Sequence, residues 1–119
     1  EWQDIIKGRK TVLLQTSIIP FMNNPNKIKQ IRGILEENKD KCIIWRPHPL
    51  MEATILAHRP QDINDYYKLV DDFLNTDNIF DNTSTAEIAI SVADEMISDR
   101  SSLVTLWKAT GKKLTMMEG

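Results

Sequence analysis

Short apolar runs alternate with segments of helical periodicity along the whole chain, and this alternation constrains the possible folds more than any other feature. The apolar runs lie at residues 11–15, 41–45, 78–81, 95–98 and 113–117. The segment after the first run shows the helical spacing most clearly, with Ile28, Ile31, Ile34 and Leu35. Such alternation predicts an α/β domain with a mostly parallel sheet of five or more strands and right-handed crossovers. Because the runs are almost continuously apolar, we expect helices on both faces of the sheet, as in a Rossmann-like three-layer domain.

Element boundaries are predicted from capping and helix-breaking residues. Pro47 and Pro49 are expected to end the second strand, because proline cannot donate to a sheet ladder. Asp62 is expected to cap the helix that follows it, and Ser84 with Glu87 fits a capping box. The runs at 11–15, 42–45 and 95–98 are expected to be the central strands. The apolar faces of the last two helices are predicted to contain Ile88, Ala89, Val92, Ala93, Leu103, Leu106 and Trp107.

Length and composition indicate one globular domain. The chain has 119 residues, of which 41% are hydrophobic and 27% charged, and this balance excludes a disordered or fibrous class. A net charge of −2 with both signs interspersed argues against a nucleic-acid partner. No apolar run reaches the length of a transmembrane span. The chain begins at Glu1 and ends soon after its last predicted strand, so we expect residues 1–119 to be a single domain of a larger protein.

Polar side chains gather where the predicted strands end. Ligands of open parallel sheets bind beyond the carboxyl ends of the strands. This edge is rich in hydroxyl groups and carries two arginines and a histidine, which suit a phosphate-bearing ligand. The candidate residues are Thr16, Ser17, Arg46, His48, Thr83, Ser84, Ser98, Asp99, Arg100, Ser101 and Ser102.

Two loops within this set are the sharpest candidates. Ser101 and Ser102 stand at the start of a predicted helix, where hydroxyls and free backbone N–H groups can bind phosphate. The alternative is that Asp99 or Ser101 simply caps an ordinary helix. In the other loop two prolines hold His48 in extended backbone, so that it can donate to a phosphate while Arg46 clamps one. The alternative there is a surface histidine in a rigid turn.

Other chemistries find little support in the sequence. The glycines are isolated, which argues against a dinucleotide fingerprint or a P-loop. Cys42, His48 and His58 do not have metal-ligand spacing, so neither a metal nor another cofactor is expected. The single cysteine excludes an internal disulfide and is expected in the core, which suits a reducing compartment. His58 is expected on an exposed helical surface.

Two motifs resemble those of a known family. Arg46-Pro47-His48-Pro49 is followed by Ala93-Asp94-Glu95-Met96-Ile97-Ser98-Asp99-Arg100-Ser101-Ser102. They resemble the R-x-H-P and A-D-x-x-I-[ST]-D-Y-S-S motifs in the C-terminal half of the CDP-glycerol glycerophosphotransferases, which build teichoic-acid-type polymers. The resemblance extends from about Lys10 to Met117. Arg100 replaces the family's tyrosine, Thr85 stands where the family usually has an aspartate, and Gln15 or Thr16 replaces a proline.

The resemblance implies that the chain is the donor-binding half of a two-domain GT-B transferase. Such an enzyme moves glycerol phosphate from CDP-glycerol to a teichoic-acid-like or other cell-surface polymer. His48 would be catalytic, contacting the donor phosphates or assisting the leaving group, and Ser101 and Ser102 would hold the pyrophosphate without metal. The polymer or lipid-linked acceptor and its activating base would belong to the other half. The resemblance also implies a cytoplasmic domain, with the full-length protein peripheral at the inner face of the membrane.

Two alternatives remain open. A GT-B glycosyltransferase or a UDP-N-acetylglucosamine 2-epimerase relative would share the same site but use a nucleotide-sugar. A non-catalytic receiver-like module has a similar element order, and Asp81 could serve as its phospho-acceptor. That module needs an acidic pair after the first strand, where this chain has Thr16 and Ser17. It also needs a lysine after the fifth strand, whereas Lys112 and Lys113 precede that strand.

Overall fold

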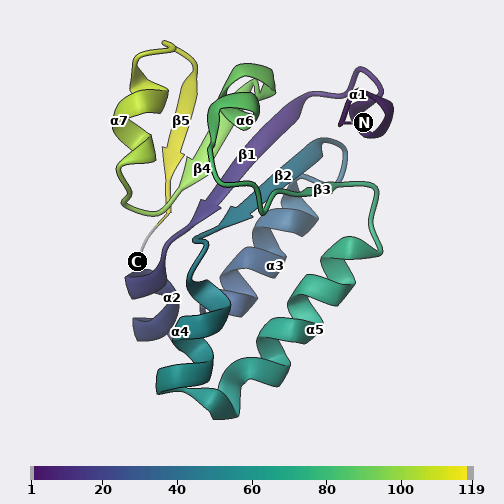
Figure 1. The fold of residues 1–119 in the computed structure, drawn as a ribbon. Helices are drawn as coiled ribbons and strands as arrows, with labels where there is room; N and C mark the ends of the chain where they lie inside the picture. Colours follow the sequence, from purple (N-terminus) through teal and green to yellow (C-terminus); the bar gives the residue numbers. More distant parts are fainter. Residues whose placement is uncertain (1, 118–119) are drawn as a thin grey trace.

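A parallel five-stranded sheet forms the centre of the molecule (Figure 1). The computed structural model describes residues 2–117. The strand order is β3-β2-β1-β4-β5, and every neighbouring pair is parallel. The predicted α/β class and the three predicted central strands are therefore confirmed. The strands are β1 (Thr11–Thr16), β2 (Cys42–Pro47), β3 (Ile79–Phe80), β4 (Glu95–Ser98) and β5 (Lys113–Met116).

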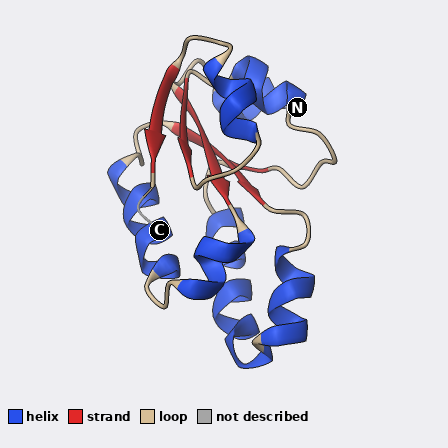
Figure 2. Cartoon of the chain, turned by 90° about the vertical axis from the view of Figure 1, so that its left-hand side faces the viewer, coloured by secondary structure: helices blue, strands red, loops and turns tan. Residues whose placement is uncertain are grey.

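Helices cover both faces of this sheet, as Figure 2 shows from the side. One layer contains α2 (Ile18–Asn23), α3 (Lys27–Glu37), α4 (Met51–His58), the 3₁₀ turn η1 (Pro60–Asp62) and α5 (Ile63–Leu74). The other contains α1 (Trp2–Ile6), α6 (Glu87–Val92) and α7 (Leu103–Lys108). The arrangement is the three-layer, Rossmann-like one that the sequence predicts.

Each face of the sheet has its own hydrophobic core. Leu14 packs with Trp45 in the core under α3 and α5, whereas Leu13 packs with Met96 in the core under α6 and α7. Successive residues of β1 thus enter opposite cores, because side chains alternate along a strand. This double burial explains why the first strand is apolar at consecutive positions. Trp45 anchors the larger core, with its ring centroid 5.4 Å from that of Phe73.

The second strand continues two residues beyond the predicted run at 41–45. Pro47 is its last residue and pairs with Thr16 of β1. Successive backbone N–H groups of a strand point to opposite sides. The N–H of His48 donates to the Thr16 carbonyl of β1 at 3.0 Å, so an N–H at position 47 would point toward β3. That strand has already ended at Phe80. A proline at position 47 therefore removes no ladder hydrogen bond.

Several local predictions were wrong. Within the described residues α6 begins at Glu87 without a side-chain cap, so Ser84 and Glu87 do not form a capping box. The side chain of Asp62 bonds Arg59 rather than capping α5. Ile88 and Leu106 are 61% and 59% exposed, because these six-residue helices bury little more than one side chain each.

One helix, α2, was not predicted at all. Pro20 makes its sequence look like a loop, yet this residue lies in the first helical turn. Backbone N–H groups of a first turn have no partner within the helix, so proline is tolerated there.

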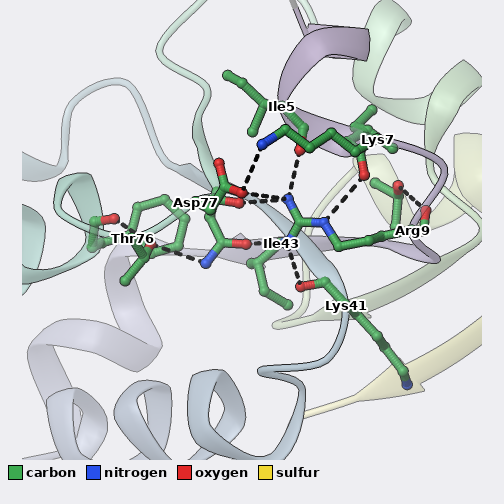
Figure 3. Close-up of polar contacts among 11 residues, drawn as sticks. Ile5, Lys7, Arg9, Lys41, Ile43, Thr76 and Asp77 are labelled. Atoms are coloured by element: carbon green, nitrogen blue, oxygen red, sulfur yellow. Dashed lines mark hydrogen bonds and ion pairs between the residues drawn. The ribbon is translucent and has the colours of Figure 1, made fainter.

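Arg9 ties three segments together at the amino end of the sheet (Figure 3). Its guanidinium donates to the carbonyls of Ile5 and Asp77 at 2.6 Å each and to that of Lys41 at 3.3 Å. It also lies 3.8 Å from the Asp77 carboxylate, which Lys7 approaches to 3.6 Å. This cluster fixes α1 against the starts of β2 and β3, at the end of the sheet opposite the candidate site.

Candidate functional site

The carboxyl ends of the three central strands bring the predicted loops to one edge. Gln15 lies in register between Arg46 and Ser98, so the segments after β1, β2 and β4 begin side by side. The backbone N–H of His48 donates to Thr16, and the N–H of Asp99 donates to the Gln15 carbonyl at 3.1 Å. Loops more than thirty residues apart in sequence are thereby fixed to the same central strand.

A buried ion pair holds two of these loops together. Lys27 and Asp99 are each 1% exposed, and Lys27 Nζ lies 2.5 Å from Asp99 Oδ1. The other carboxylate oxygen accepts the Ser17 N–H at 2.9 Å, and the Ser17 hydroxyl donates to the Arg100 carbonyl at 2.9 Å. The carboxylate of Asp99 therefore points inward and positions the loops. Sequence reasoning missed Lys27, because a lysine at a helix start gives no sign that it is buried.

Arg46 is likewise held inside the protein. Its Nη1 lies 3.1 Å from Asp81 Oδ2 and 3.3 Å from the Thr83 hydroxyl. Asp81 Oδ1 accepts from the Thr83 backbone N–H at 3.0 Å and from its hydroxyl at 2.6 Å. Arg46, which the sequence predicts to clamp a phosphate, neutralises the buried Asp81 and orders the turn after β3.

Several predicted hydroxyls also have partners within the protein. Thr16 accepts the Trp45 indole N–H at 3.1 Å, and Ser98 donates to the Asp99 carbonyl at 2.6 Å, with both side chains buried. Ser101 accepts the Leu103 N–H at 3.0 Å, although the N-cap of α7 is Ser102, which makes no side-chain cap hydrogen bond. The predicted residues left exposed at this edge are Thr83, Ser84, Arg100 and Ser102.

His48 lines a polar pocket of about 270 Å³ beyond the ends of β2 and β3. Its Nδ1 accepts the Leu50 backbone N–H at 3.1 Å, so the neutral ring carries its proton on Nε2. The ring is half-buried and can act as a fixed hydrogen-bond donor. Ser101 does not line this pocket, although it lies at the same edge. The full lining is Pro47, His48, Pro49, Glu52, Tyr66, Phe80, Asp81, Asn82 and Thr83.

Glu52 lines this pocket and bonds a neighbouring phenol. Its Oε2 accepts the Tyr67 hydroxyl at 2.6 Å, and this hydrogen bond raises the pKa of Tyr67. Burial, with a smaller contribution from the Glu52 charge, raises the pKa of Tyr66 to about 12. Both phenols are therefore protonated at neutral pH. In the hydrogen-bonded pair of Tyr67 and Glu52, the negative charge lies on the Glu52 carboxylate. Sequence reasoning missed Glu52, because an exposed glutamate on a helix gives no sign that it borders a pocket.

The predicted positions of His58 and Cys42 are confirmed. His58 is exposed at the end of α4, and Cys42 is buried in the core, where desolvation raises its thiol pKa. Within residues 2–117, His, Cys, Asp and Glu side chains form no group that could hold a metal ion. No helix in this part of the chain is long and apolar enough to cross a membrane.

Comparison of the chain with protein-family models, with curated proteins and with solved structures found no match.

Proposed function

We propose that this domain binds a nucleotide-activated donor at the carboxyl edge of its sheet, as the donor half of a transferase. The donor best supported by the motifs at 46–49 and 93–102 is CDP-glycerol, and the acceptor is a teichoic-acid-like or other cell-surface polymer. The parallel Rossmann-like fold supports the proposal, because such folds bind ligands at this edge. The proposal places the domain in the cytoplasm, where activated nucleotides are available.

One observation carries the proposal: the backbone fixes both the position and the tautomer of His48. Two flanking prolines restrict its backbone, the Thr16 carbonyl holds its N–H, and Leu50 occupies its Nδ1. The remaining Nε2–H donor is aimed by these contacts before any ligand arrives. A pre-oriented donor stabilises developing negative charge without the cost of reorganisation.

The reaction follows from that arrangement. An acceptor hydroxyl oxygen attacks the phosphorus of the glycerol phosphate, and the bond from this phosphorus to the bridging oxygen breaks. CMP leaves with the electron pair, and His48 stabilises its phosphate by hydrogen bonding. The acceptor proton passes to a base in the other half of the enzyme. Arg100 and Ser102, exposed on the neighbouring loop, contribute a positive charge and a hydroxyl toward the phosphates.

A nucleotide-sugar remains the second candidate donor. Arg100 stands where the glycerophosphotransferase motif has a tyrosine, and this exposed, basic side chain changes the chemistry of the phosphate loop. A UDP-sugar would use the same edge and the same His48 donor.

An NMR titration of the isolated domain tests the proposal. CDP-glycerol, CDP and a UDP-sugar are compared, each with and without EDTA. We expect CDP-glycerol to shift amides at 16–17, 48–52 and 99–103, and His48→Ala to weaken binding about tenfold, the loss of one charge-assisted hydrogen bond. His58→Ala is the matched control and should leave affinity unchanged. Binding that EDTA abolishes, or that His48→Ala leaves intact, contradicts the proposed site.

A further inference from the structure

The pocket beside His48 contains a carboxylate whose charge no basic residue neutralises. Two acidic side chains line it, Asp81 and Glu52. Asp81 is paired with Arg46 at 3.1 Å. Within residues 2–117 no lysine, arginine or histidine forms an ion pair with Glu52, whose bonded partner is the neutral Tyr67 hydroxyl. The pocket as a whole is therefore negative.

This charge determines what the pocket can take. Glu52 is exposed, so solvent weakens its field, but a phosphate placed directly against it would still meet a like charge at short range. Two neutral hydroxyl groups would instead be attracted, because a carboxylate is a strong hydrogen-bond acceptor and can receive two O–H donors. Tyr67 holds Oε2, which leaves Oε1 and the outer lone pair of Oε2 for a ligand.

The other polar groups of the pocket complement a hydroxyl-rich ligand. The exposed Asn82 amide can both donate and accept, and His48 offers its Nε2–H. Tyr66 and Phe80 supply apolar walls for the carbon skeleton. Thr83 is already engaged with Asp81 and the Thr85 carbonyl, so its role is to shape the wall.

Resting on the proposed function, we propose that this pocket binds a vicinal diol of the donor, with Glu52 as the residue that selects it. The phosphates then lie on the other side of His48, toward Arg100 and Ser102. The diol belongs either to the glycerol group or to the ribose, which share this chemistry. His48 stands at the junction between the neutral and the anionic parts of the ligand.

Neutral probes test the pocket independently of nucleotide binding. Glycerol, methyl β-D-riboside and its 2-deoxy analogue are titrated by NMR into the wild type, Glu52→Gln and the control Glu37→Gln. Glu37 is exposed at the end of α3, on the amino side of the sheet, and its replacement removes the same charge. We expect the diols to shift amides at 48–52 and 82–83, and the deoxy analogue to bind several-fold more weakly. Glu52→Gln should weaken the diols about tenfold. Equal binding of riboside and deoxyriboside, or of wild type and Glu52→Gln, overturns the proposal.

Nucleotide probes then distinguish the two sources of the diol. If ribose occupies the pocket, 2′-deoxy-CDP binds more weakly than CDP and Glu52→Gln removes the difference. If glycerol occupies it, that difference is absent and Glu52→Gln weakens glycerol 3-phosphate and CDP-glycerol but not CDP. If the diols bind but CDP-glycerol does not, the proposed function is refuted and the assignment of the pocket as a diol site is supported. Tighter CDP-glycerol binding by Glu52→Gln places phosphate against Glu52 and refutes the diol assignment alone.

Discussion

Removing either charge of the buried Lys27–Asp99 pair should cost a large part of the domain's stability. Both side chains are 1% exposed and their charged atoms are 2.5 Å apart, so neither charge has water to replace its lost partner. Breaking such a pair by removing one member costs about 3–5 kcal/mol, against a total stability of about 5–15 kcal/mol for an ordinary domain. Lys27→Met keeps the length of the side chain, and Asp99→Asn keeps an acceptor for the Ser17 N–H.

The double variant separates the cost of an unpaired buried charge from the cost of a lost hydrogen bond. Lys27→Met/Asp99→Asn buries no charge at the pair, so its cost should fall to about 1–2 kcal/mol, the loss of hydrogen bonding alone. The two single losses therefore should not add, and a double-mutant cycle should show a coupling free energy of several kcal/mol. Urea unfolding followed by tryptophan fluorescence measures all three, because Trp45 lies in the adjoining core.

An exposed ion pair serves as the control. Lys39 and Glu36 are 2.8 Å apart but 76% and 72% exposed, so Lys39→Met should not measurably change stability. If Lys27→Met and Asp99→Asn are as mild as this control, or if their effects add in the double variant, the pair does not hold these loops together.

Three further predictions concern other parts of the fold. Arg9→Ala should lower the free energy of unfolding by about 2–3 kcal/mol in thermal melts, because the guanidinium donates to several backbone carbonyls. Full rescue by Arg9→Lys would contradict this, since one ammonium group cannot reproduce the planar, forked donors of a guanidinium. Tyr66 stays protonated in the folded state up to about pH 12, whereas an unfolded tyrosine ionises near pH 10. Stability should therefore fall as pH rises from 10 to 12, and ultraviolet titration should show a late tyrosinate; a stability that is flat over this range would refute the assignment. Cys42 should react with a thiol reagent only after unfolding, and rapid labelling of the native protein would count against its burial.

The sheet could be predicted because its signal is local. The run at 11–15 is apolar at consecutive positions, and a strand buried on both faces requires such a run. The loops at its carboxyl edge followed from the same reasoning, since parallel strands end together.

The inner chemistry of the site was not predictable, because it depends on partners far along the chain. Inside the protein, Lys27 pairs with Asp99, which lies 72 residues later in the chain. Arg46 was predicted to bind a ligand phosphate, but its guanidinium forms an ion pair with Asp81. Glu52 gains its importance from Tyr67 and from the turn after β3, and the helical pattern records neither contact. Periodicity shows which face of an element is apolar, but does not show which polar groups meet.

The position of β1 at the centre of the sheet has a consequence for synthesis on the ribosome. One edge of this strand pairs with residues about thirty positions later, since Thr11 faces Cys42. Its other edge pairs with β4, where Val12 faces Glu95. Until most of the chain has emerged, the nascent domain presents a long, apolar strand with one row of unpaired backbone groups, which is a template for intermolecular pairing. We expect this edge of β1 to stay unpaired until β4 has been synthesised and can bond to it.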